Sequence, residues 1–378
     1  MKIGFDIDSL TIKSGGIGRY AVNLINSIAR ISLSKTQNDV FIFFHNSFDR
    51  NLIEKYPNVK FVKKYTNIKS NVLRKGIFLP FSIKNMKIDL FHGLDHIGIP
   101  FICKNKRCKY VATIHDLITL IYPDKFTSKH RLILNTLLPK VLKKADRIIA
   151  DSNSTKNDIV RFYPEYESKT KVIYAGMDKR FFQRSSQEIE KTLKKYNINF
   201  KYFLFLGTVE PRKNIVNVIE AFIRLKQEGN VEHKLVITGR KGWLYKEILE
   251  RMRKTPFSND IVFTDFIDDE DLPFLYSGTE IFLYPSLYEG FGLPVLEAMA
   301  CGTPVITSNV SSLPEIAGDA ALLVNPVNIE EIARAIEMLT RNSKIREEMR
   351  KKALERSKFF SWEKAAKETL KIYEEIVT

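Results

Sequence analysis

The feature that most constrains the fold of this chain is a regular alternation of short apolar runs with amphipathic helical runs. Stretches rich in Val, Ile, Leu and Phe recur along the sequence, and helical patterns fill most of the gaps. Such an alternation predicts parallel sheets with helices on both faces. The expected strands are 2–8, 40–46, 58–64, 88–93, 110–116, 146–152 and 171–176 in the first half, and 202–207, 234–239, 261–266, 281–286, 304–309 and 321–326 in the second.

The length of the chain and the two series of strands predict two domains. A chain of 378 residues is too long for one comfortable core. We expect the link between the domains near 176–200, where the pattern breaks, and a Gly-rich loop at 14–20. We expect Ser152 or Ser154 to cap a helix. The other expected helices are 214–228, 243–253, 293–301, 328–341, 344–358 and 361–377.

The net charge of +16 lies entirely in the first half of the chain. Residues 1–180 hold 32 Lys and Arg against 15 Asp and Glu, a net charge of +17, and the remainder carries −1. A charge field of this kind attracts anionic surfaces. Three interpretations stay open: a solvated lysine-rich surface, an acidic membrane leaflet or anionic lipid-linked acceptor, and nucleic acid. Nucleic acid is the least favoured, because no helix-turn-helix, RNP or zinc-finger pattern accompanies the charge.

The cysteines and the hydropathy indicate where the protein works. Cys103, Cys108 and Cys301 cannot all pair, and they lack the spacing of a zinc site. We therefore expect reduced structural thiols, which are typical of a cytoplasmic protein. No apolar run approaches the ~20 residues of a membrane span, and residues 1–8 resemble a strand more than a signal peptide. We expect a cytoplasmic location, with peripheral attachment to the inner face of the cytoplasmic membrane as an open alternative.

The stretch 288–305, YEGFGLPVLEAMACGTPV, is the most informative part of the sequence for function. An expected strand ends before it and a helix starts near Leu293, so the loop between them lies at the carboxyl end of a strand, where ligands bind in such sheets. The free amides and partial positive charge of a helix start suit a phosphate. Gly290 and Gly292 let a ligand approach the backbone closely.

Two glutamates flank this glycine-rich loop. Carboxylates accept hydrogen bonds from pairs of hydroxyl groups, which sugars and riboses supply. Glu289 and Glu297 therefore suit a ligand that has a sugar, a diphosphate and a ribose in a row. Taken as two isolated residues, they equally fit a surface loop glutamate and a favourable charge on the helix dipole.

The complete string EGFGLPVLEAMACGTPVI resembles the signature of the retaining glycosyltransferases of family 4, which have the GT-B fold. The stretches 203–215 (FLFLGTVEPRKNI) and 311–326 (SSLPEIAGDAALLVNP) resemble the same family, as do GGIGRY, TIHDL and ADSNSTKNDI in the first half. The sequences of the two stretches IHDL and YPDKF are most similar to those of the mannosyltransferase-type branch, which builds surface polysaccharides of bacteria and archaea. The resemblance covers nearly the whole chain.

This resemblance implies an α/β fold of the GT-B type. Two doubly wound, Rossmann-like domains with parallel sheets would enclose an interdomain cleft, and the C-terminal helix would cross back to domain one. We therefore assign residues 1–180 plus 361–378 to an N-terminal, acceptor-side domain. Residues 181–360 would form the C-terminal domain that binds the nucleotide sugar.

The resemblance also implies roles for individual residues. Arg212 and Lys213 would neutralise the leaving diphosphate, because fixed cations stabilise a charge that builds during bond cleavage. Glu297 would bind the ribose hydroxyls, and Glu289 would face the donor sugar. His115 would reach that sugar from the opposite domain. The predicted catalytic residues are His115, Glu289, Arg212 and Lys213, and the predicted binding residues are Gly15, Gly16, Gly207, Arg212, Lys213, Glu289, Gly290, Phe291, Gly292, Leu293 and Glu297.

Three further expectations concern the chemistry. Asp116 would orient His115, contact the acceptor or cap a helix. No covalent nucleophile is assigned, since the family's usual proposal is front-face attack with the leaving phosphate as proton acceptor. We expect no obligatory cofactor and no metal, because Arg212, Lys213 and the helix start supply positive charge. The letters DID at 6–8 match an Asp-x-Asp motif, but they belong to the end of a strand.

The leading hypothesis is therefore a retaining hexosyltransferase. It would move mannose from GDP-mannose, with a UDP-sugar as the other candidate donor, to a glycan or lipid-linked glycan acceptor in surface polysaccharide synthesis. An acidic membrane surface is a candidate partner of the basic first domain, and no nucleic acid is expected. Two alternatives stay open: a nucleotide-sugar epimerase on the same fold, and a non-enzymatic basic module that binds anionic polymers or membranes.

Overall fold

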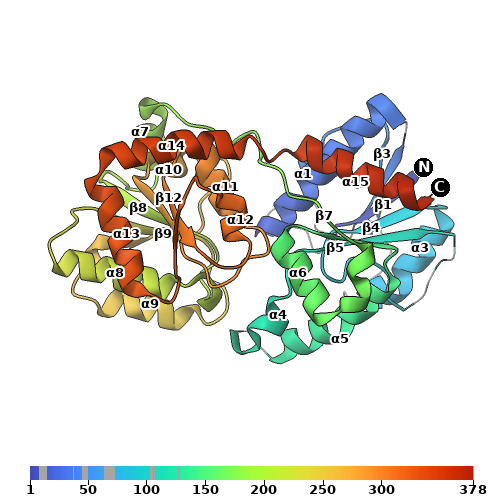
Figure 1. The fold of residues 1–378 in the computed structure, drawn as a ribbon. Coiled ribbons are helices and arrows are strands. Elements are labelled where there is room, and N and C mark those ends of the chain that lie inside the picture. The colour runs from blue at the N-terminus through green and yellow to red at the C-terminus, as the bar shows by residue number, and fades with distance from the viewer. Residues whose placement is uncertain are drawn as a thin grey trace. The chain divides into compact units, whose positions relative to one another are not determined.

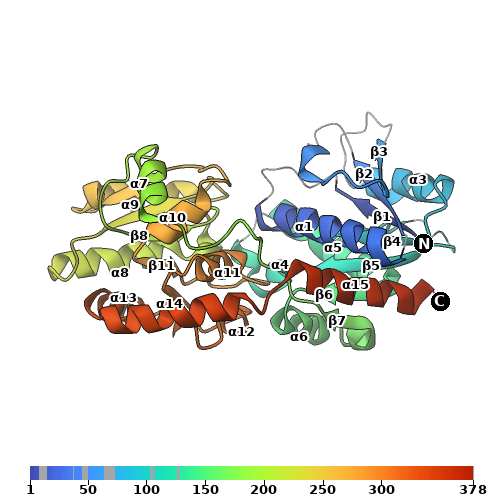
Figure 2. The ribbon, with the colours of Figure 1, turned by 90° about the horizontal axis from the view of Figure 1, so that it is seen from above.

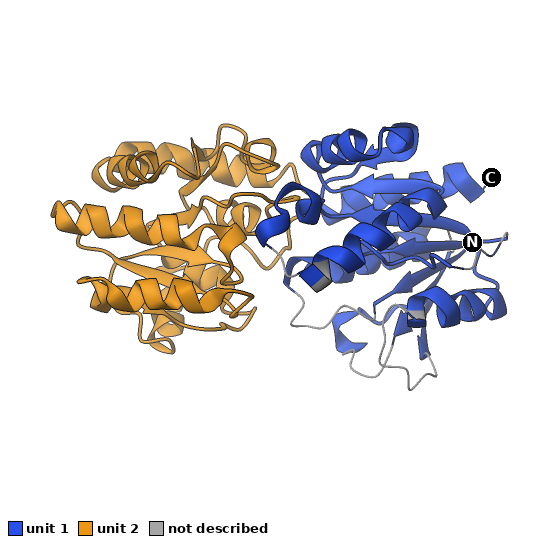
Figure 3. Cartoon of the chain, turned by 90° about the horizontal axis from the view of Figure 1, so that it is seen from below, with its two compact units in different colours: residues 1–176, 361–378 blue, residues 177–360 orange. Residues whose placement is uncertain are grey.

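The computed structural model describes residues 1–7, 15–36, 38–44, 50–63, 73–102, 105, 107–125 and 128–377. The chain divides into two compact units (Figure 3). Unit 1 comprises Met1–Gly176 and Ser361–Thr378, and unit 2 comprises Met177–Phe360. Each unit is built on a parallel sheet, as the alternation of strands and helices predicts.

Unit 1 contains a seven-stranded sheet with the order β3-β2-β1-β4-β5-β6-β7. The direction of the strand order reverses between β1 and β4, and ligands of open parallel sheets bind outside the carboxyl ends of the strands at such a switch point. The strands are β1 (Lys2–Asp6), β2 (Asp39–Phe44), β3 (Val59–Lys63), β4 (Leu90–Gly93), β5 (Lys109–Ile114), β6 (Arg147–Ala150) and β7 (Thr170–Val172). The α-helices are α1 (Gly15–Ile31), α3 (Leu79–Asn85), α4 (Ile118–Ile121), α5 (Ser128–Lys144), α6 (Asn153–Phe162) and α15 (Trp362–Val377).

Helices cover both faces of this sheet. Apolar side chains of α3, α5 and α6 share one buried cluster with alternate residues of the strands. On the other face α15 lies beside α1 (Figures 1 and 2). The hydroxyl of Tyr373 lies 2.5 Å from Nδ1 of the buried His92 on β4. A Cβ atom added to Gly176 would lie only 2.0 Å from the backbone nitrogen of Trp362. The C-terminal helix is thus an integral part of the core of unit 1.

Unit 2 contains a six-stranded sheet with the order β10-β9-β8-β11-β12-β13, so its switch point lies between β8 and β11. One large apolar cluster joins the strands to the helices around them. The strands are β8 (Tyr202–Leu206), β9 (Lys234–Thr238), β10 (Ile261–Phe263), β11 (Ile281–Tyr284), β12 (Val305–Ser308) and β13 (Leu322–Val324). The α-helices are α7 (Ser186–Lys194), α8 (Ile215–Gln227), α9 (Tyr245–Lys254), α10 (Leu272–Gly278), α11 (Leu293–Ala300), α12 (Leu313–Ala317), α13 (Ile329–Arg341) and α14 (Ser343–Ser357).

One local expectation is wrong in part. A loop was expected at 14–20, but α1 already begins at Gly15, because Tyr20 joins the buried stripe that continues through Leu24 and Ile28 at helical spacing. The division between the units falls between Gly176 and Met177, at the edge of the stretch 176–200 where the link is expected. The same stretch contains helix α7, which begins with a capping box formed by Ser185 and Glu188. The expected cap of α6 is confirmed, since the side chain of Ser152 accepts a hydrogen bond from the amide of Thr155 at 3.0 Å.

Cys108 and Cys301 are buried thiols without a disulfide. Cys103 and the segment 8–14 lie outside the described residues. This segment holds Asp8, the last residue of the DID motif, and the first residue of the expected loop. Within the described ranges, no helix has both the length and the hydropathy needed to span a bilayer. The same ranges contain no group of three or more side chains placed to hold a metal ion.

The contact between α15 and β4 yields a stability prediction. Tyr373→Phe removes the hydroxyl next to His92 without changing the ring, and it leaves a buried imidazole nitrogen without its partner. We expect the free energy of unfolding of unit 1 to fall by about 1–3 kcal/mol. Urea denaturation followed by circular dichroism and fluorescence measures this change.

Tyr56→Phe is the matched control. The hydroxyl of Tyr56 bonds Glu54 on the surface of the same unit, where water replaces the lost partner. A loss for Tyr373→Phe no larger than that of Tyr56→Phe would contradict the structural role of the His92 contact.

Candidate functional site

The candidate site of unit 2 lies where two neighbouring strands end. The chain leaves β8 and forms a short 3-10 helix at Pro211–Lys213, and it leaves β11 and forms the loop that leads into α11. Because β8 and β11 are adjacent and parallel, these two segments meet at the switch point of the sheet although they are more than seventy positions apart in the sequence.

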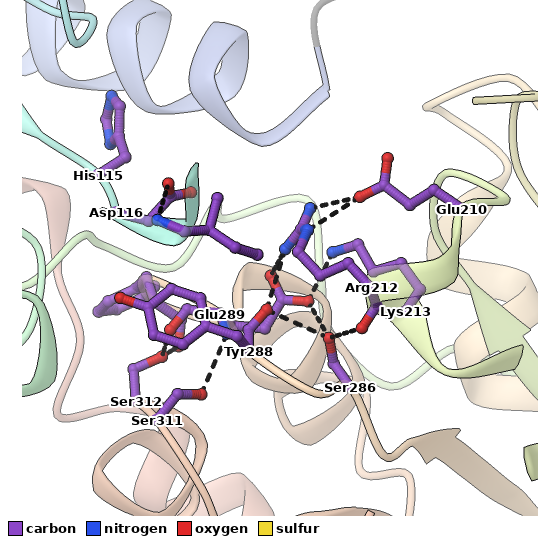
Figure 4. A network of polar contacts seen from close by, with 12 residues as sticks. His115, Asp116, Glu210, Arg212, Lys213, Ser286, Tyr288, Glu289, Ser311 and Ser312 are labelled. Carbon is purple, nitrogen blue, oxygen red and sulfur yellow. Dashed lines mark hydrogen bonds and ion pairs between the residues drawn. The ribbon is translucent and has the colours of Figure 1, made fainter. Parts of the chain in front are cut away.

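A buried carboxylate organises this meeting point (Figure 4). Glu289 Oε2 accepts a hydrogen bond from Arg212 Nη1 at 2.9 Å, and Oε1 accepts from Lys213 Nζ at 2.6 Å. The hydroxyl of Ser286 donates to the same Oε1 at 2.6 Å. The ammonium of Lys213 also donates to the hydroxyl of Tyr284 at 2.5 Å. One carboxylate thus fixes two cations that follow each other in the sequence.

The titration behaviour follows from this geometry. Burial alone would raise the pKa of Glu289, but the charges of Arg212 and Lys213 and the hydrogen bonds outweigh it and lower the pKa from 4.5 to about 2. Burial and the neighbouring charge of Arg212 lower the pKa of Lys213, against the opposing effect of Glu289. Glu289 is therefore ionised at neutral pH, and it offsets much of the repulsion between the two cations.

Arg212 has a second carboxylate partner, which the sequence did not indicate. Its Nε donates to Glu210 Oε1 at 2.9 Å, and its Nη1 donates to the carbonyl oxygen of Tyr288 at 3.1 Å. Burial raises the pKa of Glu210, against the charges of Arg212 and Lys213. Glu210, Tyr284 and Ser286 were all missed, although each lies within five positions of a predicted site residue.

The loop before α11 is held by two serines of the segment that follows β12. The hydroxyl of Ser312 donates to the carbonyl oxygens of Glu289 and Phe291 at 2.9 and 2.8 Å, and the hydroxyl of Ser311 accepts from the amide of Glu289 at 3.0 Å. Gly292 has a φ of +105°, and a Cβ atom there would lie 2.8 Å from Leu313. Because φ is positive and the side chain of Leu313 leaves no room for a Cβ atom, this position directly before the helix requires glycine.

Glu297 occupies a separate environment on the buried side of α11. Its Oε2 accepts a hydrogen bond from the hydroxyl of Tyr276 on α10 at 3.0 Å. It lies beyond the first turn of α11, so a role as a first-turn charge does not apply. The two glutamates of the motif thus have different partners: Glu289 holds the two cations, and Glu297 contacts a tyrosine.

Gly207 directly follows β8 and is part of a close backbone contact. A Cβ atom added to Gly207 would have ordinary contacts, the nearest at 3.7 Å, but one added to Gly239 would lie 1.9 Å from the carbonyl oxygen of Gly207. Gly239 follows β9 and has a φ of +142°. Only glycine therefore fits at position 239, whereas a side chain at position 207 would find room. Gly239 is not among the residues predicted from the sequence.

The predicted residues of unit 1 lie at the carboxyl ends of its strands. Gly15 and Gly16 are exposed at the start of α1. His115 follows β5 and is buried; its Nδ1 lies 2.5 Å from Asp151 Oδ2, and its Nε2 lies 3.0 Å from the carbonyl oxygen of Leu94. Burial opposes the charge of His115, but Asp151 and the hydrogen bonds together raise its pKa from 6.5 to about 9.

Three roles were expected for Asp116: to orient His115, to contact the acceptor or to cap a helix. The structure shows the contact with the start of a helix. Its Oδ1 accepts a hydrogen bond from the amide of Ile118, the first residue of α4, at 3.2 Å. Its backbone carbonyl and amide both contact Nε2 of His96, at 2.9 and 3.2 Å. His96 and Asp151 were not singled out from the sequence.

Comparison with known protein families covers both units. The model described as "Glycosyltransferase Family 4" matches residues 14–181, and the model described as "Glycosyl transferases group 1" matches residues 187–356. The chain is 30% identical to the O-antigen chain mannosyltransferase B of Escherichia coli, over 99% of each protein. The chain therefore belongs to the glycosyltransferases of family 4, and it is a glycosyltransferase of the GT-B fold.

Solved structures show the same fold. Sucrose-phosphate synthase from Thermosynechococcus elongatus superimposes with a TM-score of 0.78 and 21% identity, over 100% of this chain and 99% of that one. The Anabaena protein Alr3699/HepE, solved in complex with UDP and glucose, superimposes with a TM-score of 0.76 and 17% identity, over 99% of each chain. The fold predicted from the sequence is thus confirmed.

The charge cluster yields a prediction for Glu289→Gln. This variant leaves the buried Lys213 and Arg212 without their shared anion, and we expect unit 2 to lose about 3–5 kcal/mol of unfolding free energy at pH 7. Since the pKa of Glu289 is lower in the folded chain, its contribution is present above about pH 4.5 and is lost as the pH falls toward 2. The difference between wild type and variant should therefore shrink between pH 5 and pH 2, as urea denaturation can measure.

Glu190→Gln provides the control, because Glu190 pairs with Lys194 on the exposed face of α7 in the same unit. We expect it to leave stability nearly unchanged at every pH. A Glu289→Gln variant with a pH-independent loss would show that the ionised carboxylate is not the stabilising group.

Proposed function

We propose that this glycosyltransferase is a retaining hexosyltransferase that moves mannose from GDP-mannose to a glycan or lipid-linked glycan in the synthesis of a surface polysaccharide. The observation that carries the proposal is the Arg212–Lys213–Glu289 cluster at the switch point of unit 2, in a chain that is 30% identical over nearly its whole length to an O-antigen mannosyltransferase. The UDP in the HepE structure is in keeping with a nucleotide-diphosphate donor.

In this proposal Arg212 and Lys213 stabilise the negative charge of the leaving diphosphate. As the bond between the anomeric carbon and the diphosphate breaks, negative charge builds on the phosphate oxygens, and cations already fixed in place stabilise it without reorganisation. Glu289 supplies this fixation through its two short contacts. The cluster of Glu210, Arg212, Lys213 and Glu289 carries no net formal charge, so the diphosphate would share the cations with the carboxylates.

The loop and the first turn of α11 complete the donor site. Gly290, Phe291, Gly292 and Leu293 bring backbone amides to the start of a helix, where a phosphate is favourably bound. Glu297 would bind the ribose hydroxyls through its carboxylate, which Tyr276 orients. The amides at Gly15 and Gly16 start α1 in the same way in unit 1, and Gly207 directly follows the strand that precedes the two cations.

The proposed transfer proceeds with retention of configuration and without a covalent enzyme intermediate. The acceptor hydroxyl attacks from the face that the leaving phosphate vacates, and a phosphate oxygen takes its proton. Arg212 and Lys213 supply the positive charge that a metal ion supplies in other phosphate-transfer sites, so the proposal requires no metal.

A nucleotide-sugar screen tests the donor. Bound donor stabilises the folded chain by mass action, so GDP-mannose should raise the melting temperature more than UDP-glucose or UDP-galactose. Arg212→Ala should lower kcat/KM for GDP-mannose by about 100-fold, the usual effect of losing one fixed donor to a developing oxyanion. Glu297→Ala should weaken GDP-mannose binding in the same thermal-shift assay.

Arg224→Ala is the control, because Arg224 pairs with Glu228 and Glu330 on the surface of the same unit. It should bind GDP-mannose as the wild type does. Binding that is unchanged in both Arg212→Ala and Glu297→Ala would reject the site, and a larger shift with a UDP-sugar would reject the donor.

An exposed apolar patch on unit 1 supports attachment to an acidic membrane. Leu73, Ile77 and Phe81 follow each other every four residues along the π-helix at Arg74–Phe78 and α3, and they are 45%, 38% and 61% exposed. Ile102, 57% exposed, adjoins them, since a Cβ atom added to Gly76 would lie 2.6 Å from its Cδ1. Apolar side chains within a unit of high positive charge suit an anionic bilayer surface.

Vesicle sedimentation tests this attachment. The wild type should sediment with vesicles that contain phosphatidylglycerol and remain in solution with phosphatidylcholine alone. A double substitution, Ile77→Ser with Phe81→Ser, should reduce the bound fraction several-fold, whereas Phe182→Ser, at an exposed phenylalanine of unit 2, should not. Equal sedimentation with both vesicle types would end the proposal.

A further inference from the structure

The guanidinium of Arg212 is held by two carboxylates of the protein itself (Figure 4). Its Nε and Nη2 atoms lie 2.9 and 2.8 Å from the same oxygen, Glu210 Oε1. Its Nη1 atom donates to Glu289 Oε2 and to the carbonyl oxygen of Tyr288. Arginine binds phosphate best when two N–H groups of one edge point at two phosphate oxygens. A diphosphate that uses the Nε–Nη2 edge of Arg212 therefore competes with Glu210.

The two carboxylates are held with different strength. Glu289 accepts hydrogen bonds from Arg212, Lys213 and Ser286, and these contacts and charges lower its pKa to about 2. Among the residues that the structure describes, the carboxylate of Glu210 bonds only to Arg212. Burial outweighs the neighbouring cations there and raises the pKa of Glu210. Glu210 is thus the carboxylate that yields more easily to a competing anion.

The loop after β9 covers Glu210 and leaves it 2% exposed. The amide of Val209 donates to the carbonyl oxygen of Arg240 at 2.7 Å, and the amide of Gly242 donates to that of Val209 at 3.0 Å. A Cβ atom added to Gly242 would lie 3.3 Å from Cβ of Glu210. Water cannot replace Arg212 at so buried a carboxylate, so the loss of this partner strongly favours its protonated form.

The basic groups of this covering loop have partners of their own. Lys241 pairs with Asp265 at 2.9 Å, and the guanidinium of Arg240 lies over the ring of Phe266 at 5.0 Å. The charged and titratable groups of unit 2 that act most strongly on Glu210 therefore belong to its own cluster, and they are Arg212, Lys213, Tyr284 and Glu289.

We propose that Glu210 is a placeholder anion for the donor diphosphate: it neutralises Arg212 until a diphosphate binds, and then it leaves the Nε–Nη2 edge and takes up a proton. Two anions share one guanidinium edge only at high cost, so the carboxylate with a single partner gives way. Arg212 and Lys213 stay in place, because Glu289 holds both. The ligand class is a diphosphate diester, and the inference rests on the proposed transfer from a nucleotide sugar.

Isothermal titration calorimetry with GDP-mannose tests the competition without turnover. At about pH 7.5, Glu210→Gln should bind GDP-mannose about tenfold more tightly than the wild type, because glutamine carries no competing charge. Glu289→Gln should bind more weakly, because the cations lose their fixation. Glu220→Gln removes a carboxylate that pairs with Arg251 elsewhere in unit 2, and it should bind as the wild type does. Equal or weaker binding by a Glu210→Gln variant that melts cooperatively overturns the proposal.

The pH dependence tests the proton. Binding of the dianionic diphosphate favours protonated Glu210, so the wild-type affinity should rise as the pH falls from about 8 to about 6, and Glu210→Gln should lose this part of the rise. Other titrating groups, such as His115, act alike in both proteins. Calorimetry in two buffers of different ionisation enthalpy should show greater proton uptake by the wild type than by Glu210→Gln. Tighter binding by the variant with unchanged proton uptake would reject the exchange and leave Glu210 a simple repulsive charge.

Inorganic pyrophosphate separates this inference from the proposed donor, because it has neither base nor sugar. It should also bind more tightly to Glu210→Gln than to the wild type and to Glu220→Gln. That result without any binding of GDP-mannose would support the placeholder and reject the donor. Equal binding of both ligands by wild type and Glu210→Gln would reject the placeholder and leave GDP-mannose as the donor.

Discussion

The rest of the candidate donor site depends on one ion cluster, the carboxylate of Glu289 between Arg212 and Lys213. Two adjacent cations in a buried position repel each other and lose the water that would solvate them. The shared carboxylate offsets both costs, and because it comes from the loop after β11 while the cations follow β8, it also ties the ends of two strands together. The geometry that holds the cations is therefore the geometry that holds the loop before α11.

The same principle recurs in unit 1 with different residues. There the charge pairs Lys75–Asp95 and His115–Asp151 support the loop after β4. In both units the side chains at the switch point are fixed by buried charges of opposite sign. A site of this kind can meet an ionic or polar substrate without first moving its cations, which is the condition for strong electrostatic stabilisation.

The sequence predicted the order and type of most elements, because short apolar runs such as 202–207 and 234–239 form strands that are buried on both faces. It missed α7, whose polar sequence is helical through its capping box and tertiary contacts. The motif located Arg212, Lys213 and Glu289, but their pairing depends on the adjacency of β8 and β11. Tyr284 and His96 were missed for the same reason, since partners distant in sequence are set by topology.

The position of α15 has a consequence for biosynthesis. A chain emerging from the ribosome presents α1 early, but the helix that covers part of this face, with Trp362 and Tyr373, is made only after the whole of unit 2. Unit 2 is complete in the nascent chain before unit 1, although unit 1 begins first. Residues 1–176 must therefore wait, with a strip of apolar surface uncovered, until α15 has been synthesised, and chains released before that point would keep the strip exposed to aggregation and to chaperones.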